Sequence, residues 1–267
     1  MDVALGIDIG GTTVKSALVD RTGALIQKRS VRTESSAGHV KMAHDIAAMA
    51  KDMSKDLPDR CTVVGAGAGA PGPVEGRMLL GAVNLGWGET PLAQAIERSS
   101  GLPTVLLNDA NAAALGERWA ARSHGGDLAE NLLFATLGTG VGGAIIVNGS
   151  LLNGAHACGG EIGHIPSGKS EKRVCGCGNL DCLETYASAN GLLATANNLF
   201  VTNQVSAVPT CEELFERVKA GDRLATKALD DTIDLLARAL AGIINTIDPE
   251  MVIIGGGLSA AGGTPIR

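Results

Sequence analysis

Short apolar runs separated by glycine-containing turns dominate the first part of the chain. The runs at 3–9, 14–19 and 25–31 have the length of strands, and the turns between them lie at 10–13 and 20–23. This pattern predicts strand–turn–strand units, not the strand-to-helix loop of a dinucleotide fingerprint.

Apolar residues at helical spacing alternate with further short apolar runs downstream. Helices are predicted at 37–57, 91–100 and 112–121, and strands at 62–69 and 105–107. The second half begins with a glycine-rich turn that leads into an apolar run. It continues with predicted helices at 185–200, 210–219 and 222–246, and with a buried strand at 251–254 before three consecutive glycines.

Composition narrows the class of protein. The 267 residues suffice for two modest domains or one large one, and only 2% are aromatic, so the core must consist of Ala, Val, Leu and Ile. A net charge of −6 without a basic run argues against a nucleic-acid partner. We expect no membrane partner, because no apolar stretch is long enough for a span. Six cysteines without a signal-type start predict a cytoplasmic protein.

Two glycine-rich turns are candidates for binding phosphate. Successive backbone N–H groups in such turns can hold an anion, and glycine lets the anion approach closely. A carboxylate at the preceding strand end, Asp8, could hold a phosphate-bound magnesium ion. A plain hairpin turn explains the first turn alone, but a second turn of the same kind favours phosphate binding. The turns comprise Gly10, Gly11, Thr12 and Thr13, and Gly138, Thr139 and Gly140.

A cluster of cysteines predicts a structural zinc site. Cys175, Cys177 and Cys182 lie close together in sequence, and His164 lies a short loop upstream. Three thiolates and one imidazole form a closed tetrahedral ligand set. The alternative is a group of reduced cysteines in an apolar pocket. A disulfide is disfavoured because one of the three cysteines would stay unpaired.

The spacing of glycines from Leu137 to His164, together with the segment CGCGNLDCLE at 175–184, resembles the ROK family of bacterial sugar kinases and related repressors. Two positions depart from the family pattern. Asp181 stands where a glycine is usual before the last cysteine, and Ala157 replaces a frequent glycine. Neither departure removes an expected ligand.

The resemblance implies an α/β protein with the actin-like ATPase (ribonuclease H-like) fold, in which two domains flank a cleft. We expect residues 1–110 to carry the first phosphate loop and the catalytic aspartate. Residues 111–267 would carry the second phosphate loop, the zinc site and an adenosine loop. The implied activity is ATP-dependent phosphorylation of a hexose at its 6-hydroxyl, and glucose is the leading candidate for that hexose. Asp109 is the implied general base, although its position before a helix also suits an N-cap.

The same resemblance assigns two groups of residues. Some assignments have a simpler alternative: Asn84 as a turn residue, His164 as a zinc ligand only, and Glu184 as an acid at a helix N-terminus. The nucleotide group is Asp8, Gly10, Gly11, Thr12, Thr13, Lys15, Gly138, Thr139, Gly140, Gly256 and Gly257. The sugar group is Asn84, Asn108, Asp109, Glu161, His164 and Glu184.

Alternatives to glucose phosphorylation stay open. The sugar could be N-acetylmannosamine, fructose, mannose or allose, and the donor could be polyphosphate. A sugar-sensing repressor is disfavoured because the chain starts at the first phosphate loop. Relatives continue beyond Arg267 into a final helix, so a catalytically impaired sugar-binding form is a further expectation. The resemblance also implies a homodimer.

Overall fold

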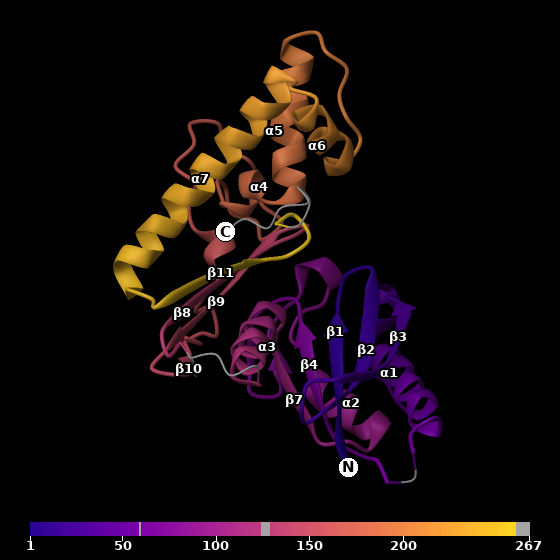
Figure 1. Ribbon diagram of the computed structural model, residues 1–267. Helices are drawn as coiled ribbons and strands as arrows, with labels where there is room; N and C mark the ends of the chain where they lie inside the picture. Colours follow the sequence, from indigo (N-terminus) through magenta and orange to yellow (C-terminus); the bar gives the residue numbers. More distant parts are fainter. Residues whose placement is uncertain (59, 124–128, 260–267) are drawn as a thin grey trace. The chain divides into compact units, whose positions relative to one another are not determined.

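The chain forms two compact units in the computed structural model, which describes residues 1–58, 60–123 and 129–259 (Figure 1). One unit comprises residues 1–128 and 153–158, and the other comprises 129–152 and 159–267. The boundary expected from the sequence, between residues 110 and 111, falls inside helix α3 (Asp109–Ser123), which lies in the first unit.

The first unit is built on a five-stranded sheet of order β3-β2-β1-β4-β7. β1 pairs antiparallel with β2 and parallel with β4, which in turn pairs parallel with β7. The carboxyl ends of β1, β4 and β7 therefore meet at one edge of the sheet. The strands are β1 (Asp2–Ile9), β2 (Thr13–Asp20), β3 (Leu25–Arg32), β4 (Thr62–Ala70) and β7 (Thr104–Asn108).

Alternation along the strands separates the two faces of this sheet. Alternate β1 residues from Val3 to Ile9 are buried in a core with α1 (Gly38–Lys55) and α2 (Leu92–Ser100). The other face of β4 packs against α3, because a Cβ on Gly69 would lie 3.5 Å from the Cβ of Ala112. The short elements β5 (Val74–Glu75), β6 (Met78–Leu79), η1 (Ser35–Ala37) and η2 (Val83–Leu85) complete the unit.

The second unit repeats this pairing pattern in a four-stranded sheet of order β10-β9-β8-β11. β8 pairs antiparallel with β9 and parallel with β11, as β1 does with β2 and β4. The turn after β8 therefore corresponds to the turn after β1. The strands are β8 (Leu132–Leu137), β9 (Val141–Val147), β10 (Ser150–Leu151) and β11 (Met251–Gly255).

Helix α7 (Arg223–Ile247) is the long helix of the second unit in Figure 1, and it links two apolar clusters. Its Leu235, Leu236 and Leu240 pack with residues of β8 and β9. Its Ala225 and Ala228 instead pack against Phe200 and other residues of the neighbouring helices. The other helices are η3 (Ile162–His164), α4 (Glu184–Ala187), α5 (Ala189–Thr202) and α6 (Cys211–Lys219).

Most predicted elements are present, but the helix expected at 185–200 is broken. Ser188 adopts an extended conformation with φ −85° and ψ 173° between α4 and α5. Its hydroxyl accepts a hydrogen bond from the Gly191 N–H at 3.1 Å and so caps α5. Ser188 was the signal in the sequence for a new helix start, but the alanines on either side of it favoured the prediction of one continuous helix. Thr210 accepts from the Glu213 N–H, as its capping pattern predicted.

Within the described ranges, none of the helices combines the length and the apolar character that crossing a bilayer requires.

Candidate functional site

The first glycine turn is held by hydrogen bonds to its carbonyl groups. The Gly10 N–H donates to the Thr13 carbonyl at 3.0 Å and closes the turn. Thr33 donates from its backbone to the Thr12 carbonyl at 2.9 Å and from its hydroxyl to the Gly10 carbonyl at 2.7 Å. Among the described residues, the amides of Gly11 and Thr12 have no acceptor, so they are available to an anion.

Three predicted residues lie around this turn. Asp8 pairs with Lys15 across the β1–β2 ladder, and the Lys15 Nζ lies 3.6 Å from an Asp8 carboxylate oxygen. Asn84, in η2, approaches the turn from another segment: a Cβ on Gly11 would lie 3.3 Å from the Asn84 carbonyl oxygen. The structure therefore brings Asp8, Lys15 and Asn84 to the same turn.

Asp109 is the first residue of α3, directly after β7. The capping role belongs to its neighbour Asn108, whose Oδ1 accepts from the Asn111 N–H at 3.1 Å and whose Nδ2 donates to the Gly72 carbonyl at 3.2 Å. Asn108 is buried with its amide engaged on both sides, so its predicted sugar contact stays a prediction. The Asp109 Oδ1 accepts from the adjacent Ala110 N–H at 2.8 Å.

The pKa of Asp109 is raised above its usual range. Protein atoms around the carboxyl group reduce its hydration, which is the largest cause, and the negative charge of Asp8 adds to it, against the Ala110 hydrogen bond. The side chain nevertheless reaches solvent. Asp8 lies opposite Gly69 in the β1–β4 register, and a Cβ on Gly69 would lie only 3.3 Å from the Asp109 Cα. The two carboxylates thus lie at one edge of the sheet.

The second glycine turn lies beside the glycines that follow β11. The Gly138 N–H donates to the Gly140 carbonyl at 3.0 Å. Gly256 has φ +92°, and a Cβ there would lie 2.3 Å from the Leu137 carbonyl oxygen. The Leu258 N–H donates to that same oxygen at 3.0 Å. The predicted second phosphate loop and adenosine loop are therefore in direct contact.

The four predicted zinc ligands converge, with their ligand atoms all within 4.8 Å of one another. The Sγ atoms of Cys177 and Cys182 are 3.7 Å apart, and the Cys175 Sγ is 3.7 Å from the His164 Nδ1. Tetrahedral zinc with Zn–S bonds of about 2.3 Å separates two sulfurs by about 3.8 Å. The donor set therefore fits the ion, and it leaves the second ring nitrogen of His164 for another partner.

The cysteines also show why a cation suits this cluster. Burial raises the pKa of the Cys175 thiol, and its hydrogen bond with Glu184, 2.9 Å from Sγ to Oε1, raises it further. Burial likewise raises the pKa of Cys182. A bound metal ion favours the thiolate form of such groups.

The two departures from the family pattern share a backbone conformation that favours glycine. Ala157 has φ 54° and Asp181 has φ 71°. Asp181 has partners that offset this strain. Its buried carboxylate accepts from the Gly168 N–H at 3.2 Å and the Lys172 Nζ at 2.5 Å, and from the Ser167 hydroxyl. The Lys172 and Ser167 contacts lower the pKa of Asp181 to about 2.

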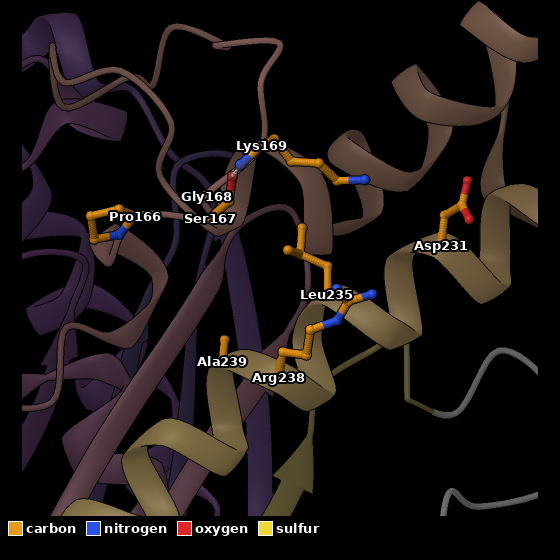
Figure 2. Close-up of a pocket in the computed structure, with 8 residues that line it drawn as sticks. All are labelled: Pro166, Ser167, Gly168, Lys169, Asp231, Leu235, Arg238 and Ala239. Carbon is orange, nitrogen blue, oxygen red and sulfur yellow. Dashed lines mark hydrogen bonds between the residues drawn. The ribbon is translucent and has the colours of Figure 1, made fainter.

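A separate pocket of about 290 Å³ lies between the 166–169 loop and α7 (Figure 2). Two of its charged lining residues pair with neighbours on the same helix: Arg238 with Asp234 at 2.7 Å, and Asp231 with Lys227 at 2.9 Å. None of the residues predicted from the sequence lines this pocket.

The predicted residues thus form one group in each unit. Asp8, the first turn, Lys15, Asn84, Asn108 and Asp109 lie in the first unit, and Glu161 lies with the second turn, the zinc cluster and Glu184 in the second. The sequence analysis missed Thr33 and Gly69. The alternating glycines of β4 were a signal of close backbone approach, whereas nothing in the sequence marked Thr33.

Comparisons with known proteins agree on one family. The profile of the ROK family matches residues 4–267. A glucokinase from Halalkalibacterium halodurans is 37% identical over 98% of this chain and 82% of the relative. An N-acetylmannosamine kinase from Yersinia pseudotuberculosis is 35% identical over 98% of this chain and 86% of the relative.

A solved structure of similar fold is a ROK family glucokinase from Streptomyces griseus in complex with glucose and AMPPNP. It has a TM-score of 0.78 and 30% sequence identity, and the match covers 97% of this chain and 84% of the other.

Proposed function

The chain belongs to the ROK family, and from this premise we propose that it is an ATP-dependent hexose kinase that phosphorylates glucose at the 6-hydroxyl. The family and the actin-like ATPase fold predicted from the sequence are both confirmed. The activity is supported by the similarity to a glucokinase and to a structure that binds glucose and the ATP analogue AMPPNP.

The observation that carries the proposal is the position of Asp109. It lies at the sheet edge where β1, β4 and β7 end, at the same edge as Asp8 and the first glycine turn. A carboxylate near phosphate-binding amides suits phosphoryl transfer, because the attacking hydroxyl must lose its proton as the new bond forms. A raised pKa makes Asp109 a stronger proton acceptor than an ordinary aspartate.

In the proposed reaction, the oxygen of the sugar 6-hydroxyl attacks the γ-phosphorus of ATP, Asp109 accepts the proton of that hydroxyl, and ADP leaves. The amides of Gly11 and Thr12 and those of the second turn would hold phosphate oxygens. Asp8 would hold a phosphate-bound magnesium ion, which neutralises charge on the transferred group. Gly256 and Gly257 would let the backbone lie against the adenosine.

Sugar recognition is assigned to polar groups that suit a ligand with many hydroxyls. Asn84, Glu161, His164 and Glu184 would donate to and accept from these hydroxyls. His164 can serve two partners, because its Nδ1 faces the cysteines and its other nitrogen remains for a hydroxyl. A zinc ion held by His164 and the cysteines would fix the segments that carry the histidine and Glu184.

N-acetylmannosamine is the second candidate substrate, since the Yersinia relative is nearly as similar as the glucokinase. The deciding experiment measures ADP release with ATP and magnesium across hexoses and N-acetylhexosamines, with polyphosphate as an alternative donor. We expect the highest kcat/KM with glucose. A higher kcat/KM with N-acetylmannosamine would replace glucose as the proposed substrate without changing the proposed reaction. If none of the sugars led to ADP release, the proposal of a sugar kinase would be refuted.

Asp109→Asn tests the base. The amide can still accept from the Ala110 N–H, so the start of α3 should persist. We expect kcat to fall by about 10²–10⁴-fold, the usual contribution of a general base, with sugar affinity nearly unchanged. Turnover at the wild-type level would show that another group accepts the proton.

A cytoplasmic homodimer completes the proposal. It is supported by the family resemblance and by six cysteines, which suit a reducing compartment. Light scattering coupled to size exclusion would measure the mass in solution, and a monomer would contradict it.

A further inference from the structure

The segment carrying His164 lies directly against the second phosphate loop. Gly163 precedes the histidine and is buried in η3. A Cβ at this position would lie 2.0 Å from the Val141 carbonyl oxygen and 3.0 Å from its carbonyl carbon. Val141 is the first residue of β9, directly after the glycine turn. A shift of the histidine segment toward β9 would therefore displace the residue that ends this turn.

Glu184 contacts the zinc cluster and the same turn with its two carboxylate oxygens. Oε1 lies 2.9 Å from the Cys175 Sγ and 3.9 Å from the His164 Nδ1. Oε2 accepts from the Val141 N–H at 3.4 Å, and a Cβ on Gly140 would lie 2.6 Å from this oxygen. The glycine is thus required for the carboxylate to reach the turn.

A third contact joins the turn to the helix that follows. The Ala189 N–H, at the start of α5, donates to the Gly138 carbonyl at 2.9 Å. The segment that follows the last zinc ligand, Cys182, therefore contacts both ends of the turn, through Glu184 and Ala189. Because one of these contacts joins backbone to backbone, a shift of the cysteine segment is expected to be transmitted to the turn.

We propose that zinc binding and nucleotide binding are thermodynamically coupled, with Glu184 as the positioning residue that links them. The inference rests on the proposed function, since it takes Gly138–Gly140 as a nucleotide-binding turn and the cysteine cluster as a zinc site. With the metal bound, the ligands His164 and Cys182 fix the backbone next to Gly163 and Glu184, and Glu184 holds the amide of Val141 and the turn before it. Linkage requires that nucleotide strengthen zinc binding by the factor by which zinc strengthens nucleotide binding.

The test uses the zinc-loaded full chain and a zinc-selective chromophoric chelator, with and without saturating ADP and magnesium. We expect bound nucleotide to tighten zinc binding by about 5- to 150-fold, the usual range of coupling between sites. If the stripped chain unfolds, bound nucleotide also tightens zinc binding by stabilising the fold, and comparison with the Glu184 variants separates that contribution from the proposed link. Equal zinc affinity with and without nucleotide overturns the proposal.

Two variants locate the link. Glu184→Ala should lose most of the coupling factor while still binding one zinc, because Glu184 is not a ligand. Glu184→Gln keeps an oxygen that can accept from the Val141 N–H, so it should retain part of the factor. An undiminished factor in Glu184→Ala overturns the role of this residue.

Calorimetric titration of ADP and magnesium into the zinc-loaded wild type separates this inference from the proposed function. No nucleotide binding would refute the kinase itself and the coupling with it. If nucleotide binds but leaves the zinc affinity unchanged, the coupling alone would be refuted.

Discussion

Replacing Gly69 by alanine should slow turnover without unfolding the protein. Gly69 lies in β4 beneath the start of α3, and an added Cβ would lie 3.3 Å from the Asp109 Cα and 3.5 Å from the Ala112 Cβ. Carbon atoms usually approach to about 3.5–4.0 Å. The first turn of α3 must therefore move by about 0.3–0.5 Å, and Asp109 moves with it.

The magnitude follows from this displacement. A misplacement of about 1 Å at a reacting group can cost about 10²-fold in rate. Taken in proportion, a shift of about 0.3–0.5 Å predicts a fall in kcat of about 4- to 10-fold. Stability should change by less than about 1 kcal/mol, because alanine restricts the unfolded chain and offsets part of the contact strain.

Gly67 provides a matched control in the same strand. It faces the same side of the sheet two residues earlier, and an added Cβ would meet nothing within 4 Å. The assay measures kcat at saturating sugar and ATP for both variants, with thermal unfolding alongside. If Gly69→Ala turns over at the rate of Gly67→Ala, the packing of β4 does not set the position of Asp109.

Three further results are expected. Turnover should fall as pH drops through the raised pKa of Asp109, above the usual 3.8. Ionising this carboxyl destabilises the fold as pH rises, so Asp109→Asn should be at least as stable as wild type at neutral pH. Gly256→Ala should lower the free energy of unfolding by at least about 1–2 kcal/mol, because Gly256 has a positive φ and an added Cβ would clash with Leu137. Gly257→Ala should not lower it, because an added Cβ there meets nothing within 4 Å; thermal unfolding of both variants measures the difference. Cys182→Ser should abolish zinc binding by elemental analysis and remove about 2.7 kcal/mol of stabilisation at zinc 100-fold above Kd.

The position of Asp181 explains a departure that the sequence left open. Asp181 takes the left-handed conformation that suits glycine, yet its carboxylate holds Ser167, Gly168 and Lys172. An aspartate in place of the usual glycine therefore strains the backbone next to Cys182, but its carboxylate holds the neighbouring loop by hydrogen bonds. Ala157 has the same conformation, and nothing in the structure compensates it among the described residues.

The sequence alone determined the features that depend on neighbouring residues. The apolar runs and glycine turns specified β1, β2 and β9 and the turns before β2 and β9, because strand length and turn chemistry are local properties. The cysteine ligands were readable for the same reason, since Cys175, Cys177 and Cys182 lie within one short segment. These motifs also sufficed to identify the family.

Tertiary structure decided which residues meet across long separations. Asn108 rather than Asp109 caps α3, because the helix starts one residue earlier than a cap at Asp109 would require. The contact of Gly69 with α3 depends on the register of β4 against β7, and that of Gly163 with Val141 on how η3 packs against β9. Such contacts arise from packing between distant segments, and a pattern along the chain carries no information about that packing.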